Sequence, residues 1–306
     1  MESFMLSFHR FLRPFAAALA ALATLSFGGL AAAKAPVPVQ PALWQVSDAD
    51  TTIYLFGTIH LLPEKYDWRS AKFDRALDGS QELVLETIVD DKNPVQLMSA
   101  LSSLAFSPGQ PPLAQRVPAA KRAQLEQAVK KSGIPPAALD RMETWAAAFM
   151  LIGTQFKDMG LKTGEGVETV LRNKFVSEGK TIGELETNVE QLGYFDRLPE
   201  KAQRELLQGA IEKPVDTRDQ FNGMISAWTR GDVDAIAKTF NKELEGSPEL
   251  ENALLTQRNS NWNTWIKRRL GQPGAVMVAV GAGHLAGDGS VIELLRKDGL
   301  KVRRIQ

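Results

Sequence analysis

The segment that most restricts the fold is AVMVAVGAGH, residues 275–284, an apolar run that ends in glycines and a histidine. Such a run is typical of a β-strand with both faces covered, as in the parallel sheets of α/β proteins. Two shorter apolar segments, ELVLET and KTIGELET, have the same character and alternate with long helical stretches. The pattern predicts an α/β domain with a central mixed sheet and a large helical insertion.

The remaining elements can be placed from periodicity and turn residues. LWQVSDADTTIYLFGTIH, residues 43–60, predicts two short strands joined by a turn at 47–50, and LKVRRI at 300–305 predicts a closing strand. Helical pattern covers 69–77, 290–299 and most of 93–180 and 188–270, with breaks at 107–112 and 132–136. One long helix is predicted over 248–270, with Ser247 as N-cap, Pro248 at its first position and Gly271 after its end.

The N-terminal 33 residues have the composition of a targeting segment. Arg10 and Arg13 precede an apolar run of residues 15–30, and alanines 31–33 form an A-x-A site. The run is shorter than the roughly 20 residues of a membrane span, so it predicts a cleavable signal peptide, with an uncleaved anchor as the alternative. We therefore expect a signal peptide at 1–33, one domain at 34–306 and a periplasmic or secreted location. The chain has no cysteine, which excludes disulfides, thiolate metal ligands and lipid attachment.

Histidine is scarce in this chain and its placement repeats. The 306 residues include three histidines, of which His9 lies in the predicted signal peptide. The other two stand in matching Gly-x-x-His contexts, Gly57 to His60 and Gly281 to His284, each after an apolar run. The formal net charge of zero gives no reason to expect a nucleic-acid partner.

Four predicted strands end in residues that can bind metals or move protons, namely His60, Glu86, Glu186 and His284. Ligands of open α/β sheets bind beyond the carboxyl ends of the strands. Two histidines and one carboxylate form a known catalytic metal set that leaves a position for water. We therefore predict His60, Glu86 and His284 as metal ligands, with Glu186 as a second carboxylate able to accept a proton. The alternative is that each residue is a hydrogen-bonded structural group at a strand end.

Arg258 falls within the apolar stripe of the predicted long helix, among Leu250, Leu254, Trp262 and Trp265. A guanidinium at a buried position needs a carboxylate or a bound anion. The alternative is a side chain whose charged end reaches solvent. The two tryptophans are expected in the core.

A dinucleotide-binding loop is a poor interpretation of GAGHLAGDG, because its glycine spacing differs from G-x-G-x-x-G. No acidic residue follows at the expected distance. Arg303 and Arg304 stand there instead, which hints at a phosphate partner.

Several motifs together resemble the TraB/GumN family, which is related to the Tiki metalloproteases. They are LWQVSDADTTIYLFGTIHLLP, ELVLET, GEGVETVL, GKTIGELETNVEQLGYFDRLP, AWTRGDVDAI, RNSNW and AVGAGHLAGDGSVIELLRKDGLKV. The resemblance implies a Tiki-like, erythromycin-esterase-like α/β fold and a divalent-metal hydrolase site formed by His60, His284 and Glu86. Glu168 stands where many relatives have aspartate, and Arg258 with Asn259 and Trp262 matches a family motif. Peptidase activity belongs to the Tiki branch and is an extrapolation here.

The sequence thus favours an exported metal-dependent hydrolase, expected to act on a peptide or protein substrate. The ion would be zinc, manganese, cobalt or iron. Glu86 would be the third ligand or the general base, and Glu186 and Arg258 would orient the site or the substrate. A non-catalytic envelope protein that sequesters haem or a peptide remains the competing hypothesis, and a purely structural role the third.

Overall fold

A computed structural model describes residues 39–306, except 91–92, 159–160, 162–165, 212–213 and 245–246. The predicted signal peptide at 1–33 lies outside the described residues. Contacts group Val37–Gln306 into one unit. No helix in the described part of the chain has the length and hydrophobicity that crossing a membrane requires.

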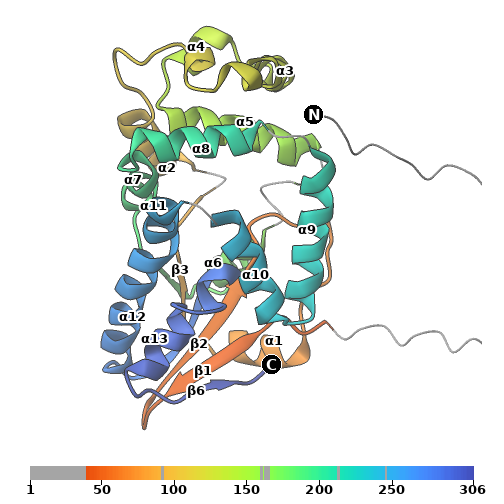
Figure 1. The fold of residues 1–306 in the computed structure, drawn as a ribbon. Coiled ribbons are helices and arrows are strands. Elements are labelled where there is room, and N and C mark those ends of the chain that lie inside the picture. The colour runs from red at the N-terminus through yellow and green to blue at the C-terminus, as the bar shows by residue number, and fades with distance from the viewer. Residues whose placement is uncertain (1–38, 91–92, 159–160, 162–165, 212–213, 245–246) are drawn as a thin grey trace, which may run out of the picture. The chain divides into compact units, whose positions relative to one another are not determined.

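The centre of this unit is a six-stranded mixed sheet (Figure 1). Its strands are β1 (Leu43–Ser47), β2 (Thr51–Thr58), β3 (Glu82–Leu85), β4 (Thr181–Glu184), β5 (Gly274–Gly281) and β6 (Val302–Arg304), in the order β4-β3-β5-β2-β1-β6. The first four strands in that order are mutually parallel, whereas β1 is antiparallel to both of its neighbours. The predicted α/β class, mixed sheet and turn between β1 and β2 are confirmed.

The helices fall into groups set by the strands between which they lie. After β2 comes α1 (Ala71–Asp78). Between β3 and β4 lie α2 (Val95–Leu104), α3 (Arg122–Ser132), α4 (Pro136–Asp140), α5 (Thr144–Asp158) and α6 (Val167–Ser177). Between β4 and β5 lie α7 (Asn188–Asp196), α8 (Glu200–Ala210), α9 (Pro214–Thr229), α10 (Val233–Leu244), α11 (Pro248–Glu251) and α12 (Gln257–Leu270). Helix α13 (Val291–Lys297) follows β5. The chain is non-helical at the expected break 107–112, and within the expected break 132–136 it is non-helical at 133–135.

Helices cover both faces of the sheet, as the continuous apolar strand β5 predicts. Alternate β5 residues face opposite ways: Met277 and Ala279 pack with α1, α6, α9 and α10, while Val278 and Val280 pack with α12 and α13. Figure 1 shows α12 and α13 along one side of the sheet, and α9 and α10 along the other. This burial fixes the ends of the parallel strands, from which the candidate site extends.

The predicted long helix over 248–270 is interrupted. Residues Asn252–Thr256 form a π-helix between α11 and α12. Pro248 opens the helix and Gly271 follows its last residue, as expected. Ser247, however, makes no side-chain capping bond, because its Oγ bonds to the Glu205 carboxylate at 3.0 Å. Insertions of this kind recur at functional sites, and this one immediately precedes Arg258.

Candidate functional site

The carboxyl ends of four neighbouring parallel strands bring the predicted residues to one edge of the sheet. His60 follows β2, Glu86 follows β3 and Glu186 follows β4, each within two residues of the strand end. His284 differs from the expectation of a continuous strand to 284: β5 ends at Gly281, and His284 lies in a 3₁₀ turn, η5 (Ala282–Leu285). Backbone pairing continues past the strands, because Glu186 N donates to Glu86 O at 2.8 Å.

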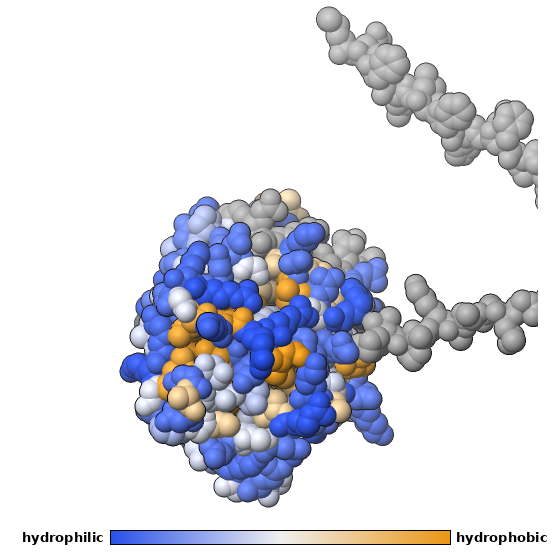
Figure 2. Space-filling view, turned by 90° about the horizontal axis from the view of Figure 1, so that it is seen from below, coloured by the Kyte–Doolittle hydropathy of each residue, from blue (hydrophilic) through white to orange (hydrophobic). Residues whose placement is uncertain are grey.

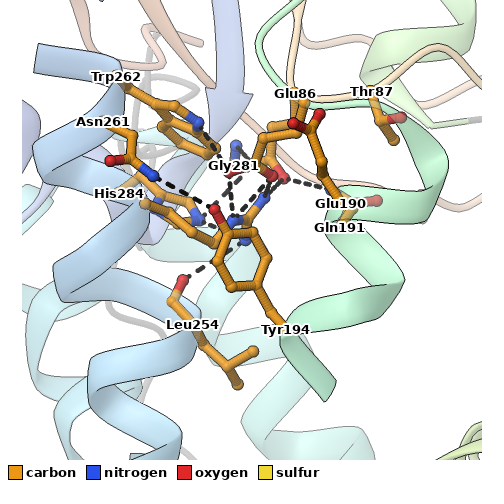
Figure 3. Close-up of polar contacts among 12 residues, drawn as sticks. Glu86, Thr87, Glu190, Gln191, Tyr194, Leu254, Asn261, Trp262, Gly281 and His284 are labelled. Carbon is orange, nitrogen blue, oxygen red and sulfur yellow. Dashed lines mark hydrogen bonds and ion pairs between the residues drawn. The ribbon is translucent and has the colours of Figure 1, made fainter. Parts of the chain in front are cut away.

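Arg258 links the two buried carboxylates, Glu86 and Glu186, within the group of polar contacts that Figure 3 shows around Glu86, Trp262 and His284. Its Nη2 donates to Glu86 Oε2 at 2.6 Å and lies 2.9 Å from Glu186 Oε2. Its Nε lies 3.0 Å from Glu186 Oε2, and the guanidinium packs over the ring of Trp262 at 4.7 Å. The structure therefore pairs this guanidinium with buried carboxylates and leaves no need for it to reach solvent. Trp262 is buried in the core, as expected, and donates its indole N–H to Glu186 at 2.9 Å.

Glu86 is the most densely bonded member of the group. The backbone N–H of Gly281 donates to its Oε1 at 2.6 Å, and the amide of Gln191 to its Oε2 at 3.1 Å. Burial by itself would raise the pKa of Glu86, but His284, Arg258, His60 and the Gly281 N–H outweigh burial and lower the pKa to about 2. Glu86 is therefore a carboxylate throughout the physiological range.

His284 is held as a neutral imidazole. Burial lowers its pKa to about 3, and the positive charge of Arg258 acts in the same direction. Its Nδ1 lies 2.7 Å from Asn259 Oδ1, while its Nε2 lies 3.2 Å from Arg258 Nη1. Because a guanidinium can only donate, Nε2 must accept and Nδ1 must carry the proton. This assignment places an acceptor nitrogen 3.7 Å from Glu86 Oε1.

His60 is paired on its other side with a glutamate. Its Nδ1 lies 2.7 Å from Glu168 Oε1, which also accepts a hydrogen bond from Thr58 Oγ1. Glu168 raises the pKa of His60 to about 9, whereas burial acts in the opposite direction. The ring is nevertheless 68% exposed. His60 thus lies at the open side of the site, with Nε2 as its unbonded nitrogen.

The three predicted metal ligands, His60, Glu86 and His284, lie around Gly281. The absence of a side chain at residue 281 allows them to approach one another there. A Cβ atom at Gly281 would lie 3.1 Å from Glu86 Oε1, 3.6 Å from His284 Cδ2 and 3.8 Å from His60 Nε2. Each imidazole has its Nδ1 bonded to an oxygen, the arrangement typical of metal-binding histidines. The Nε2 of His60 is left as a potential ligand, whereas the Nε2 of His284 already accepts from Arg258 Nη1 at 3.2 Å and would exchange that bond for an ion. The donor set therefore fits a divalent metal in kind. As arranged, no three His, Asp or Glu side chains of the described residues group closely enough to hold an ion.

Sequence reasoning placed five residues at this edge, and the structure joins four of them in one bonded network: Glu86, Glu186, Arg258 and His284. It did not assign roles to Glu168, Asn259, Gln191 or Tyr194. Asn259 and Glu168 lie within the motifs RNSNW and GEGVETVL, so the motifs contained the signal. Gln191 and Tyr194 also lie within a quoted motif, GKTIGELETNVEQLGYFDRLP, but their contacts with Glu86 and Arg258, the latter at 5.7 Å from the Tyr194 ring, could not be read from it.

The fold and site define an α/β protein with a buried Glu-Arg-Glu group and two histidines at the carboxyl edge of its sheet. The sequence profile of the TraB/PrgY/gumN family matches residues 42–304. The chain belongs to this family.

Relatives of the chain share its length. It is 25% identical over 261 residues to the uncharacterized protein YbaP of Escherichia coli K12, covering 84% of this chain and 92% of that protein. An uncharacterized protein of Treponema pallidum is 21% identical over 269 residues, covering 83% and 80% respectively. No solved structure matches the chain.

Proposed function

We propose that the protein is an exported metal-dependent hydrolase that acts on peptide bonds. The observation that supports this best is the convergence of His60 Nε2, His284 and Glu86 Oε1 on the space beside Gly281. A divalent metal held there would lower the pKa of a bound water and polarise a carbonyl. Export rests on the signal peptide predicted at 1–33. Peptide-bond specificity and a Tiki-like fold rest on the family resemblance.

The residues around this space have distinct roles in the proposal. His60, His284 and Glu86 would hold zinc, manganese, cobalt or iron. Glu168 and Asn259 fix the orientation of the two imidazoles through their Nδ1 atoms. Neither holds the ion itself, so both are positioning residues.

The surroundings of the two buried glutamates, Glu86 and Glu186, determine which of them is ionised. Arg258 helps to keep Glu86 ionised, which a ligand or a general base must be. Burial raises the pKa of Glu186, and the nearby Glu86 acts in the same direction. A carboxyl group with a raised pKa is suited to take up the proton that a hydrolytic reaction releases.

The first test is metal stoichiometry. The purified protein, a His60→Ala/His284→Ala variant and an Asp74→Asn control would be compared by elemental analysis and by titration with zinc, manganese and cobalt. Asp74 lies on α1 and is paired with Arg69 at the surface, so its loss leaves the contacts of the site intact. We expect about one ion per chain in the protein and control, and loss of binding in the double variant. No binding in any of the three proteins would refute the proposal.

A non-catalytic binding protein is the second candidate, and one contact favours it. Arg258 Nη1 donates to His284 Nε2 at 3.2 Å, so a guanidinium already engages the nitrogen that an ion would need. Such a protein would hold a peptide or haem at the same edge without turnover. Reconstitution with haem decides between them, because haem ligation by His60 gives a Soret band that His60→Ala abolishes.

A further inference from the structure

A second polar region lies apart from the strand ends that carry the histidines. It is a hollow of about 460 Å³ between α1 and the edge formed by β1 and β6. Its lining includes Lys72, Arg75 and Arg303 together with Gln45 and Tyr54, and none of its lining residues is acidic. Figure 2 looks from below at the end of the molecule where α1 and β6 lie, and shows strongly hydrophilic side chains gathered there.

Strand register and helix spacing bring these side chains together. Gln45 pairs with Tyr54 on β2 and with Arg303 on β6, so the three form a row across neighbouring strands. Lys72 and Arg75 are three residues apart on α1 and therefore point from one side of that helix. The hollow thus has a floor from the sheet and a wall from the helix, each carrying positive charge.

Two of the cations, Lys72 and Arg303, donate hydrogen bonds to neutral acceptors, so these bonds do not balance their positive charge. Lys72 Nζ donates to the carbonyl of Ile305 at 2.7 Å, and Arg303 Nη2 donates to Gln45 Oε1 at 2.8 Å. Each keeps further N–H groups for another acceptor. No carboxylate among the described residues is paired with Lys72, Arg75 or Arg303.

The acidic residues of α1 are engaged elsewhere. Asp74 bonds to Arg69 at 2.7 Å and Asp78 to Lys174 at 3.0 Å. Arg304 also lines the hollow and adds to its positive charge, but two of its nitrogens donate to the main-chain oxygens of Gly231 and Gln306, and its guanidinium lies 5.9 Å from the Trp44 ring. We therefore base the inference on the other three cations, Lys72, Arg75 and Arg303.

We infer that this hollow binds a phosphate group. Three cations, one on the floor of the hollow and two on its helical wall, suit an anion with oxygens on several sides and up to two negative charges. A planar carboxylate would instead match a single guanidinium group. The phosphate could be free or belong to a lipid headgroup, since both present the same acceptor oxygens. The inference does not depend on the proposed hydrolase, because none of these residues touches His60, Glu86 or His284.

Calorimetric measurement of pyrophosphate affinity tests whether the hollow binds a free phosphate. Co-sedimentation with phosphatidylcholine vesicles, prepared with and without phosphatidylglycerol, tests whether it binds a lipid headgroup. The test variant is Lys72→Gln/Arg303→Gln. The control is Lys201→Gln/Arg204→Gln on α8, which changes the net charge equally and removes surface cations paired with glutamates. Arg75→Gln is a further variant at an exposed position, and it removes no hydrogen bond or ion pair of the described residues, so its effect on the fold should be small.

We expect affinity to fall about tenfold for Arg75→Gln and about a hundredfold for the double variant, since one charge-assisted hydrogen bond corresponds to about tenfold. The control should bind like the unmodified protein. Pyrophosphate binding with this pattern identifies a free phosphate site, and vesicle binding alone with the same pattern identifies a headgroup site. Absence of both kinds of binding, or equal loss in the control, would overturn the inference.

Discussion

Replacing Arg258 with methionine removes the cation between two buried carboxylates. Glu86 and Glu186 are 6% and 4% exposed, so the variant leaves both charges in the interior without their shared partner. Breaking a buried ion pair by removing one partner costs about 3 to 5 kcal/mol. Burial opposes ionisation of Glu86, and Arg258 is one of the groups that outweigh burial and lower its pKa to about 2, so removing Arg258 removes part of the stabilisation of this buried charge.

The assay is equilibrium unfolding in urea with Arg269→Met as the matched control. Arg269 lies on the same helix, but its bond to Glu82 at 3.1 Å is closer to the surface and joins one carboxylate only. We expect that change to cost about 1 kcal/mol. With a slope of about 3 kcal/mol per molar urea, Arg258→Met should lower the midpoint by about 1 to 2 M.

The pH dependence of the stability loss separates an electrostatic effect from a packing effect, because a loss of packing would not change with pH. In the unmodified protein the lowered pKa of Glu86 contributes stability above pH 4.5, and this contribution is lost as the pH falls through about 2. Without Arg258, one of the groups that lower the pKa of Glu86 is lost and this pKa rises above about 2, so the variant's deficit in stability is greatest at neutral pH and shrinks as the pH falls through the raised pKa toward 2. Equal destabilisation by Arg258→Met and Arg269→Met, or a deficit that does not shrink between pH 7 and pH 2, would refute the reasoning.

Three further predictions concern the two histidines and one glycine. By NMR, the imidazole of His284 should stay in its Nδ1-protonated neutral form until the pH falls toward about 3. The imidazole of His60 should titrate above pH 6.5 and no higher than about 9, because solvent screens the charge of its exposed ring. The stability gained from the raised pKa of His60 is present below pH 6.5 and lost as the pH rises through about 9; Glu168→Gln should bring this titration back toward 6.5. Gly166→Ala would place a Cβ atom 2.1 Å from the His60 carbonyl oxygen and should lower the thermal midpoint by several degrees, whereas the control Gly153→Ala, with open space around its Cβ, should not lower it.

The fold was largely predictable because its signals are local. The apolar run of β5 and the glycines that follow it mark a buried strand and its end without any knowledge of neighbours. Proline and glycine likewise marked the outer ends of the helical segment 248–270. The π-helix between those ends gave no such signal, since Asn252–Thr256 contains no glycine or proline and the extra width of the turn appears only in the backbone.

The site was only partly predictable because its contacts are long-range. Apolar runs showed that His60, Glu86, Glu186 and His284 each follow a strand, but which strands adjoin depends on pairing between distant segments. Thr58 and Glu168, for example, meet across 110 residues. Arg258 was expected to need a carboxylate or a bound anion, and the structure supplies two carboxylates, Glu86 and Glu186, whose identity the sequence did not reveal.

The charge of the buried group determines how a metal could enter it. Glu86 and Glu186 together outweigh Arg258 by one negative charge, and neutral His284 adds nothing. A protonated His60 is paired mainly with Glu168, itself ionised, so the two cancel and the excess of one negative charge remains. An ion bound at His60 Nε2 requires that nitrogen to be deprotonated, so the ion and the proton are alternatives at one position. The Glu168 contact that orients the imidazole for an ion also stabilises the competing proton, which makes any metal affinity of this site rise with pH up to the pKa of His60.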